Sequence, residues 1–271
     1  MTDPPAPPLS AVALLHAQVW AKEHERIDCQ LSPLGLAAID ALAPARGDTV
    51  LDIGCGTGQT LLQIADRVGP EGRVTGVDIA PTLLDMARQR TRRLPQVKLI
   101  HADAQALSLA DASADTVYSR FGVMGFRDPV PAFANFRRIL RPGGRLAFAC
   151  WRSYAENALD HIPLSAAGFA APVDTTPFSL ADPDTLRRTL EMSGFTSIGI
   201  KAQDMPVSSG NLDTMTGVLL QIGPLGRILR ESPALRDKAE TRLRAALAQR
   251  GDPSLVSLQA SVWVVTAGTA R

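Results

Sequence analysis

The strongest chemical signal in the sequence is an acid followed by three alternating glycines. Asp52 lies in a short apolar run at residues 49–53, and Gly54, Gly56 and Gly58 follow it in a G-x-G-x-G pattern. Glycine adopts positive φ easily and has no Cβ, so this turn predicts a backbone that lies against a ligand at a helix N-terminus. Dinucleotide sites use G-x-G-x-x-G, and the Asp52 carboxylate disfavours an anionic pyrophosphate beside it.

Two more acids follow the next two predicted strands. Asp78 ends the strand predicted at residues 73–77 and comes about 20 residues after Gly58, the spacing at which an acid accepts hydrogen bonds from ribose hydroxyls. Asp103 follows the strand predicted at residues 97–101, where a carboxylate accepts a hydrogen bond from the exocyclic amine of adenine. Three acids at successive strand ends suit a positively charged nucleoside with a free amino group better than a diphosphate.

Further motifs extend this pattern to a known family. Residues 119–124 (SRFGVM) follow the fourth predicted strand, and residues 140–146 (LRPGGRL) precede the fifth. With the acid and glycine motifs, they make residues 32–151 resemble the class I S-adenosylmethionine-dependent methyltransferases. The most similar subgroup is that of the ubiquinone and menaquinone C-methyltransferases. The resemblance implies S-adenosylmethionine (SAM) as the cofactor.

The resemblance also implies how each motif contacts SAM. The glycines would cradle the methionine part with Asp52 near its ammonium group, and Asp78 would hold the ribose. Residues 103 and 104 would hold the adenine, and residues 120 and 121 would close the site. The cofactor-binding residues implied in this way are Asp52, Gly54, Cys55, Gly56, Gly58, Asp78, Ile79, Asp103, Ala104, Arg120 and Phe121.

Strands and helices alternate along the chain, which is typical of βαβ units and a parallel sheet. Strands are predicted at residues 49–53, 73–77, 97–101, 115–119, 145–151, 196–202 and 258–266. Helices are predicted at residues 60–68, 81–93, 130–140, 182–194 and 232–251. The predicted fold class is α/β. The resemblance implies a Rossmann-like, mostly parallel seven-stranded sheet with helices on both faces and an antiparallel last strand, which agrees with the strand count.

Two segments outside this alternation predict a helical cap on a single domain, residues 1–271. Residues 11–26 read as one helix, and Ser32-Pro33 is expected to begin a second helix that ends near residue 43. Residues 211–250 read as a helical insertion between the last two strands, since a hairpin there needs only a few residues. Its apolar residues exceed what one helix face needs, so we expect a mostly apolar, enclosed acceptor site. The alternatives are packing of the cap alone and a homodimer contact.

Candidates for acid–base chemistry are few. His24 and His161 are the candidate catalytic residues, each as a general base toward a hydroxyl or amine. Cys55, inside the glycine turn, is expected to act as a small filler rather than as a reactive thiol. Residues 119–126 contain no acid and no cluster of metal ligands is apparent, so no metal is predicted.

Composition excludes several classes of partner. Lys and Arg number 28 against 27 Asp and Glu, and the net charge of +1 gives no field that favours nucleic acid or a membrane surface. Three widely spaced cysteines and a start without a charged secretory pattern favour the cytoplasm.

The predicted function is therefore transfer of a methyl group to a small, hydrophobic or aromatic acceptor by in-line displacement, with carbon, oxygen and nitrogen all open as the acceptor atom. The alternative is a SAM-binding protein that does not methylate, as an assembly subunit or in another SAM-assisted reaction. The glycine spacing disfavours a nicotinamide oxidoreductase.

Overall fold

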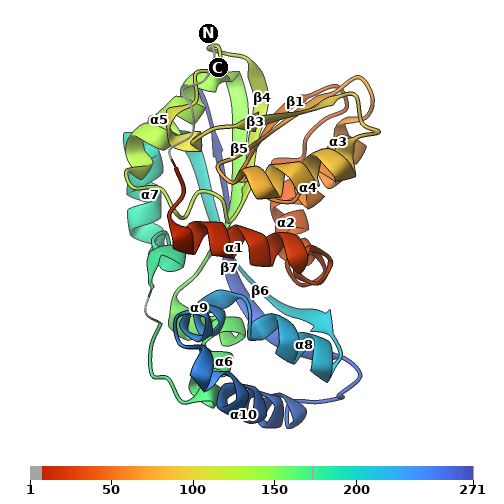
Figure 1. Ribbon diagram of the computed structural model, residues 1–271. Helices are drawn as coiled ribbons and strands as arrows, with labels where there is room; N and C mark the ends of the chain where they lie inside the picture. The colour runs from red at the N-terminus through yellow and green to blue at the C-terminus, as the bar shows by residue number, and fades with distance from the viewer. Residues whose placement is uncertain (1–7, 173, 271) are drawn as a thin grey trace.

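Seven strands form one sheet in the computed structural model, which describes residues 8–172 and 174–270 (Figure 1). Their order across the sheet is β3-β2-β1-β4-β5-β7-β6, and β7 runs antiparallel to both of its neighbours while the other pairs are parallel. The predicted fold class, with its antiparallel last strand, is confirmed. The strands are β1 (Thr49–Ile53), β2 (Arg73–Asp78), β3 (Val97–His101), β4 (Ala114–Arg120), β5 (Leu140–Trp151), β6 (Thr196–Gly210) and β7 (Val256–Gly268).

Helices cover both faces of the sheet because its central strands are apolar on both sides. Successive residues of a strand point to opposite faces, and Val50 and Leu51 of β1 accordingly belong to different hydrophobic clusters. The cluster around Val50 includes residues of α2 (His24–Leu42), α3 (Gln59–Val68) and α4 (Pro81–Thr91). The cluster around Leu51 includes residues of α5 (Pro129–Ile139) and α7 (Pro183–Met192).

The N-terminal helices divide at a different residue from the one predicted. α1 (Ala11–Lys22) ends at Glu23, and α2 then continues through Pro33 without a break. The prediction that Ser32 caps a new helix is wrong, because the Ser32 hydroxyl accepts a hydrogen bond from Gln63 of α3 instead. Nine buried residues of α2 hold the helix against its neighbours, which offsets the backbone donor that proline lacks.

Strands β6 and β7 are longer than predicted because they continue to pair beyond the rest of the sheet. Pro206 and Val207 of β6, beyond the predicted end at residue 202, face Gln259 and Leu258 of β7, and Gly210 faces Val256, which precedes the predicted start at residue 258. Helices α8 (Leu212–Leu219), α9 (Gly223–Glu231) and α10 (Arg236–Ala248) follow β6 and precede β7. They pack with α6 (Ala158–Ala167), and these four helices are called the cap below.

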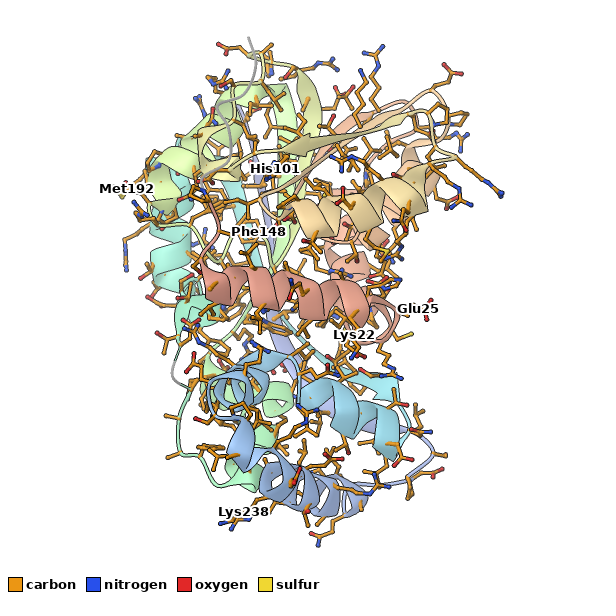
Figure 2. All side chains as sticks on the ribbon, viewed as in Figure 1. Lys22, Glu25, His101, Phe148, Met192 and Lys238 are labelled. Carbon is orange, nitrogen blue, oxygen red and sulfur yellow. The ribbon has the colours of Figure 1, made fainter. Side chains whose placement is uncertain are left out.

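The cap lies at one end of the molecule, and α1 crosses between α4 and α9 (Figure 1). Lys238 projects from the outer side of α10 in Figure 2 and is exposed. Met215 and Leu243 of the cap are buried in the same hydrophobic cluster as Ile27 of α2. The cap therefore shares its core with the sheet. No helix in the described part of the chain is long and apolar enough to cross a membrane.

Candidate functional site

The glycine turn after β1 has two glycines with different physical roles. Gly54 and Gly56 both have positive φ, +69° and +54°. A Cβ on Gly54 would lie 2.6 Å from the Cα atom of Gly122, so close packing of two backbone segments requires glycine there. A Cβ on Gly56 would meet no atom within 4 Å, and Gly56 lines a large cavity. Gly56 thus leaves open a cradle that a side chain would begin to fill.

Asp78 fixes the floor of this cradle. Its two carboxylate oxygens accept hydrogen bonds from the backbone N–H groups of Gly56 (2.8 Å) and Ala80 (2.9 Å), and its side chain lines the cavity. Burial raises the pKa of Asp78, while the backbone hydrogen bonds from Ala80, Gly56 and Ile79 lower it. Ile79 also lines the cavity, beside Asp78.

Asp52 lies behind the cradle rather than in its wall. It is fully buried, and Thr60 Oγ1 donates a hydrogen bond of 2.5 Å to its Oδ2 atom. No group in the described residues bonds its Oδ1 atom. Burial raises the pKa of Asp52 to about 7, against the opposing effects of the Thr60 hydrogen bond and the Arg120 charge. The orphaned Oδ1 atom fits a hydrogen-bond donor such as an ammonium group.

Two other residues predicted for the site have packing roles. Cys55 is buried and is absent from the cavity lining, and burial raises the pKa of its thiol, so it stays protonated. A Cβ on Gly58 would lie 3.0 Å from the Cβ of Ala87 in α4, so Gly58 allows α3 and α4 to pack closely.

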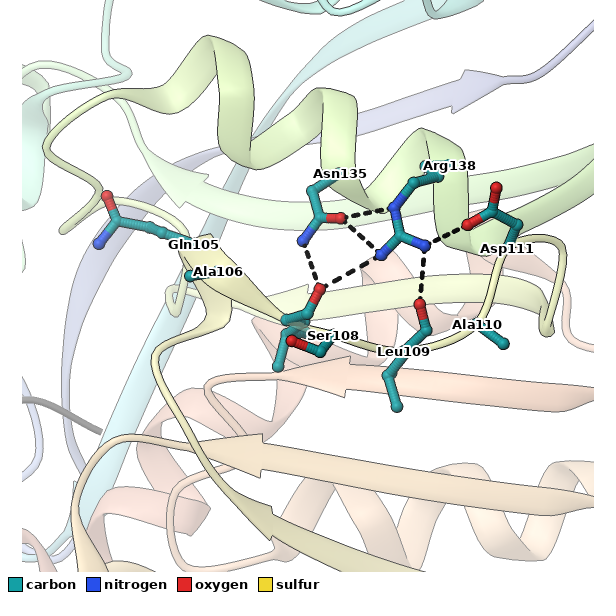
Figure 3. A pocket seen from close by; sticks show the side chains of 9 residues that line it. Gln105, Ala106, Ser108, Leu109, Ala110, Asp111, Asn135 and Arg138 are labelled. Carbon is teal, nitrogen blue, oxygen red and sulfur yellow. Dashed lines mark hydrogen bonds and ion pairs between the residues drawn. The ribbon is translucent and has the colours of Figure 1, made fainter. Parts of the chain in front are cut away.

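Asp103 and Ala104 form the next part of the cavity wall, after β3. Asp103 Oδ1 accepts a hydrogen bond of 2.9 Å from the Gln105 N–H and caps a short 3-10 helix, Ala104–Ala106. Figure 3 shows Asn135 and Arg138 of α5 binding the segment that follows, in a second and more open pocket. They donate to the carbonyls of residues 107 and 109, at 3.0 and 2.7 Å. These hydrogen bonds hold in place the segment that follows Asp103.

Arg120 and Phe121 line the cavity at the end of β4. Arg120 is 9% exposed and contacts Gln59 and Asp28, the latter at 3.9 Å. Phe121 has φ of +64°, and its ring stacks on Trp151 with centroids 4.2 Å apart. Trp151 also lines the cavity, so the stacked pair forms an aromatic wall.

The structure does not bring the predicted general bases to this cavity. His24 and His161 are both absent from its lining. His24 Nδ1 lies 2.9 Å from the Ala21 carbonyl oxygen, and the His161 ring packs edge-on against Tyr154 at 6.3 Å. The histidine side chain had suggested a general base, but neither residue lies where it could contact a molecule in the cavity.

The cavity lining also includes titratable residues that the predicted site omits, among them His16 of α1 and Asp160 of α6. Burial, with the charges of Arg230 and Arg227, lowers the pKa of His16 to about 4, so its ring is neutral. Burial raises the pKa of Asp160 to about 7. Residues 158–167 were not predicted as a helix. Asn157 before this stretch and Gly168 after it are the signals that mark the helix.

The cavity is continuous and has a volume of about 810 Å³. One half is the acid and glycine edge of the sheet, and the other half lies under α1 and the cap. The second half is mostly apolar. Its lining includes Val12, Trp20, Leu159, Pro163, Phe178, Leu219, Ile222 and Leu225.

Comparison with known proteins addresses the first half of this site. Residues 51–148 match the model of the methyltransferase domain family. The resemblance predicted from the motifs is confirmed for this methyltransferase-like segment, which lies within residues 32–151. It contains the glycine turn, the cavity-lining acids Asp78 and Asp103, and the start of the aromatic wall. The cap lies outside it.

Two curated relatives are methyltransferases by name. Aklanonic acid methyltransferase DauC of Streptomyces sp. (strain C5) is 39% identical over 119 residues, which are 43% of this chain and 54% of that protein. Demethylmenaquinone methyltransferase of Staphylococcus aureus (strain JH9) is 37% identical over 99 residues, which are 36% of this chain and 41% of that protein. The chain thus spans about half or less of the length of the curated relatives it matches.

A solved structure matches along the whole chain. The 4+2 cyclase SpnF covers 100% of this chain and 99% of its own, with a TM-score of 0.58 and 17% sequence identity. At that identity the similarity shows the fold alone. The cap region therefore belongs to a fold that other solved chains share from end to end.

Proposed function

We propose that the protein is a SAM-dependent methyltransferase that acts on a small hydrophobic or aromatic acceptor. The observation that carries this proposal is the single cavity that joins the acid and glycine edge to the apolar space under the cap. The family match of residues 51–148 and the names of the two curated relatives support it.

The residues of the edge fit SAM chemically. The open Cβ position of Gly56 leaves room for the methionine part beside the glycine turn. Asp78 and Asp103 supply carboxylates for the ribose and the adenine amine. When bound, SAM supplies an electrophilic methyl group on a sulfonium sulfur.

The contribution of this chain is to hold the acceptor and exclude water. Phe121 and Trp151 give the acceptor a flat aromatic surface at the end of the sheet. The apolar cap residues surround the rest of it, which favours a compact ring system and excludes macromolecules. Proximity and orientation in such an enclosed site lower the barrier by several kcal/mol, about 7–11 in favourable cases. The protein itself need not donate a nucleophile.

The two relatives act, by their names, on aklanonic acid and on demethylmenaquinone. Both are small molecules, so we propose a small-molecule acceptor here too. The three described cysteines are all free thiols, which supports the proposal that the protein works in the cytoplasm.

The test separates methylation from SAM binding alone. We would measure SAM binding by calorimetry and then incubate the protein with SAM and a series of hydroxynaphthoquinols, with mass spectrometry of the products. We expect S-adenosylhomocysteine together with a product heavier by one CH₂ unit. SAM binding without S-adenosylhomocysteine would favour the alternative, a SAM-binding protein that does not methylate. Absence of SAM binding would overturn both.

A further inference from the structure

Within the described residues, the cap contains a buried carboxyl group that the fold leaves without a partner. Asp160 of α6 is 9% exposed and lines the cavity. In the part of the chain that the structure describes, no side chain or backbone group bonds its carboxyl or forms an ion pair with it. Its neighbours along the cavity wall include Leu159, Pro163 and Ile222. A carboxyl in such surroundings is costly to bury.

The other buried acids show how unusual this is. The carboxylate of Glu23 accepts from Arg26 and from Gln221, at 2.9 and 3.1 Å. Asp28 pairs with Arg90 at 2.7 Å, and Asp52 accepts from Thr60. Each of these acids has at least one donor. Asp160 has none, and burial accordingly raises its pKa to about 7.

The charged groups around the cavity are engaged elsewhere. Arg227 of α9 pairs with Asp174 and Glu231, and an Arg230 N–H donates to the Gln221 carbonyl. Neither arginine forms an ion pair with Asp160, although all three residues line the same cavity.

The backbone beside Asp160 also leaves it room. A Cβ on Gly223, the first residue of α9, would lie 3.1 Å from Asp160 Oδ1. The glycine there therefore avoids tight contact with the carboxyl oxygen. The carboxyl oxygens of Asp160 therefore remain available to a molecule inside the cavity.

We propose that Asp160 is a specificity-determining contact, which accepts a hydrogen bond from a hydroxyl or amino group on the ring of the acceptor. The inference rests on the proposed function only in taking the cap half of the cavity as the acceptor site. An aromatic ring satisfies the apolar wall, and one donor group on that ring satisfies the carboxyl. An unsubstituted hydrocarbon of the same size leaves the carboxyl desolvated and unpaired, so it binds less tightly.

The test compares two probes that differ by one hydroxyl. Binding of 2-naphthol and of naphthalene is measured by calorimetry with S-adenosylhomocysteine present. A hydrogen bond to a charged group predicts a preference for 2-naphthol of about tenfold or more. We expect Asp160→Leu to abolish this preference by weakening 2-naphthol binding and strengthening naphthalene binding. Asp160→Asn should keep part of it, because the amide oxygen still accepts.

The matched control is Asp213→Asn, which changes an exposed carboxylate on α8 that pairs with Arg244 outside the cavity lining. It should leave both affinities unchanged. Thermal unfolding gives a second readout, since removal of an unpartnered carboxyl should raise the melting temperature of Asp160→Leu. A lower melting temperature would indicate a structural role and overturn the proposal.

The remaining outcomes are also decisive. An unchanged preference in Asp160→Leu, or a wild-type protein that binds neither probe, overturns the proposal. Failure to bind S-adenosylhomocysteine overturns the proposed function instead. The 2-naphthol preference and its loss in Asp160→Leu can still be measured in that case.

Discussion

The two halves of the cavity are built from the chain in opposite ways. The edge that we assign to SAM comes from consecutive strand ends between residues 52 and 121, and its main contacts are backbone N–H groups and acids. The half under the cap comes from α1, α6, α8 and α9, which are far apart in sequence. Gln30 of α2 reaches Met215 of α8 across 185 residues, and Glu23 reaches Gln221 across 198.

This difference separates a shared function from an individual one. The family model matches residues 51–148 and therefore includes the edge but none of α1, α6 or α8–α10. Backbone turns and acids at fixed positions can bind the same cofactor in many chains, whereas we propose that side chains of the cap determine which acceptor fits. Changes at the edge should thus affect cofactor binding or the fold, and changes in the cap should affect acceptor choice.

The largest expected effect is on the fold, at Gly54. In Gly54→Ala the new Cβ would meet the Gly122 Cα at 2.6 Å and also strain a positive φ. We expect a loss of about 2–5 kcal/mol in the free energy of unfolding, measured by urea denaturation.

Gly56→Ala is the matched control, because its Cβ meets nothing within 4 Å. It should cost only about 1–2 kcal/mol of stability through backbone strain, while it weakens SAM binding. Equal losses of stability in the two variants would contradict the division of roles between these glycines.

The next effect is on cofactor affinity, at Asp78. In Asp78→Ala the ribose loses its carboxylate partner, so SAM should bind about 100-fold more weakly, as expected for one or two charge-assisted hydrogen bonds. Calorimetry measures the affinity, and circular dichroism checks the fold. Asp85→Ala, which removes an exposed carboxylate of α4 that pairs with Arg88, should bind SAM normally. Unchanged affinity in a folded Asp78→Ala would refute the ribose assignment.

A smaller effect is on stability as a function of pH, at Asp160. Its pKa is about 7 in the folded protein against an ordinary value of 3.8, so the folded state binds more protons between these values. Its contribution to stability is therefore fully present below about pH 4 and is lost as pH rises to about 7. At pH 8 the free energy of unfolding of Asp160→Asn should exceed that of the wild type by about 1–3 kcal/mol.

That difference should shrink toward pH 4 in chemical denaturation. Asp52 and Asp78 also have raised pKa values. Because the wild type and Asp160→Asn both keep these two residues, the difference in stability between the two proteins reports on Asp160 alone. A gap that stays constant with pH would show that Asp160 does not titrate as described.

The smallest expected effect is none at all, on removal of metal ions. Residues 119–126 contain no acid, and the described residues contain no group of three side chains that could hold a metal. Methyl transfer should proceed at the same rate with and without EDTA. Loss of activity in EDTA that magnesium or zinc restores would contradict this prediction.

The sequence predicted the edge well because its signals are local. A glycine turn, a strand and an acid within a few residues determine one another's positions, so Asp78 could be placed beside Gly56 before any contact was known. Proline misled the prediction at one place, because Pro33 suggested a helix start where burial holds α2 continuous. Helix α6, which contains Asp160, was not predicted. No local signal indicates that Asp160 lacks a partner, because this depends on which distant segments of the chain pack around it.

The junction at Glu23 has a consequence for the order in which the molecule forms and opens. Its contact with Gln221 closes a loop of 198 residues, and closing long loops costs entropy before any contact compensates it. The sheet, whose parallel strands lie closer in sequence, can assemble without that contact. We expect the contact between Glu23 and Gln221 to form last and to open first. Amide hydrogens near these two residues should exchange with solvent well before those of β1 and β4.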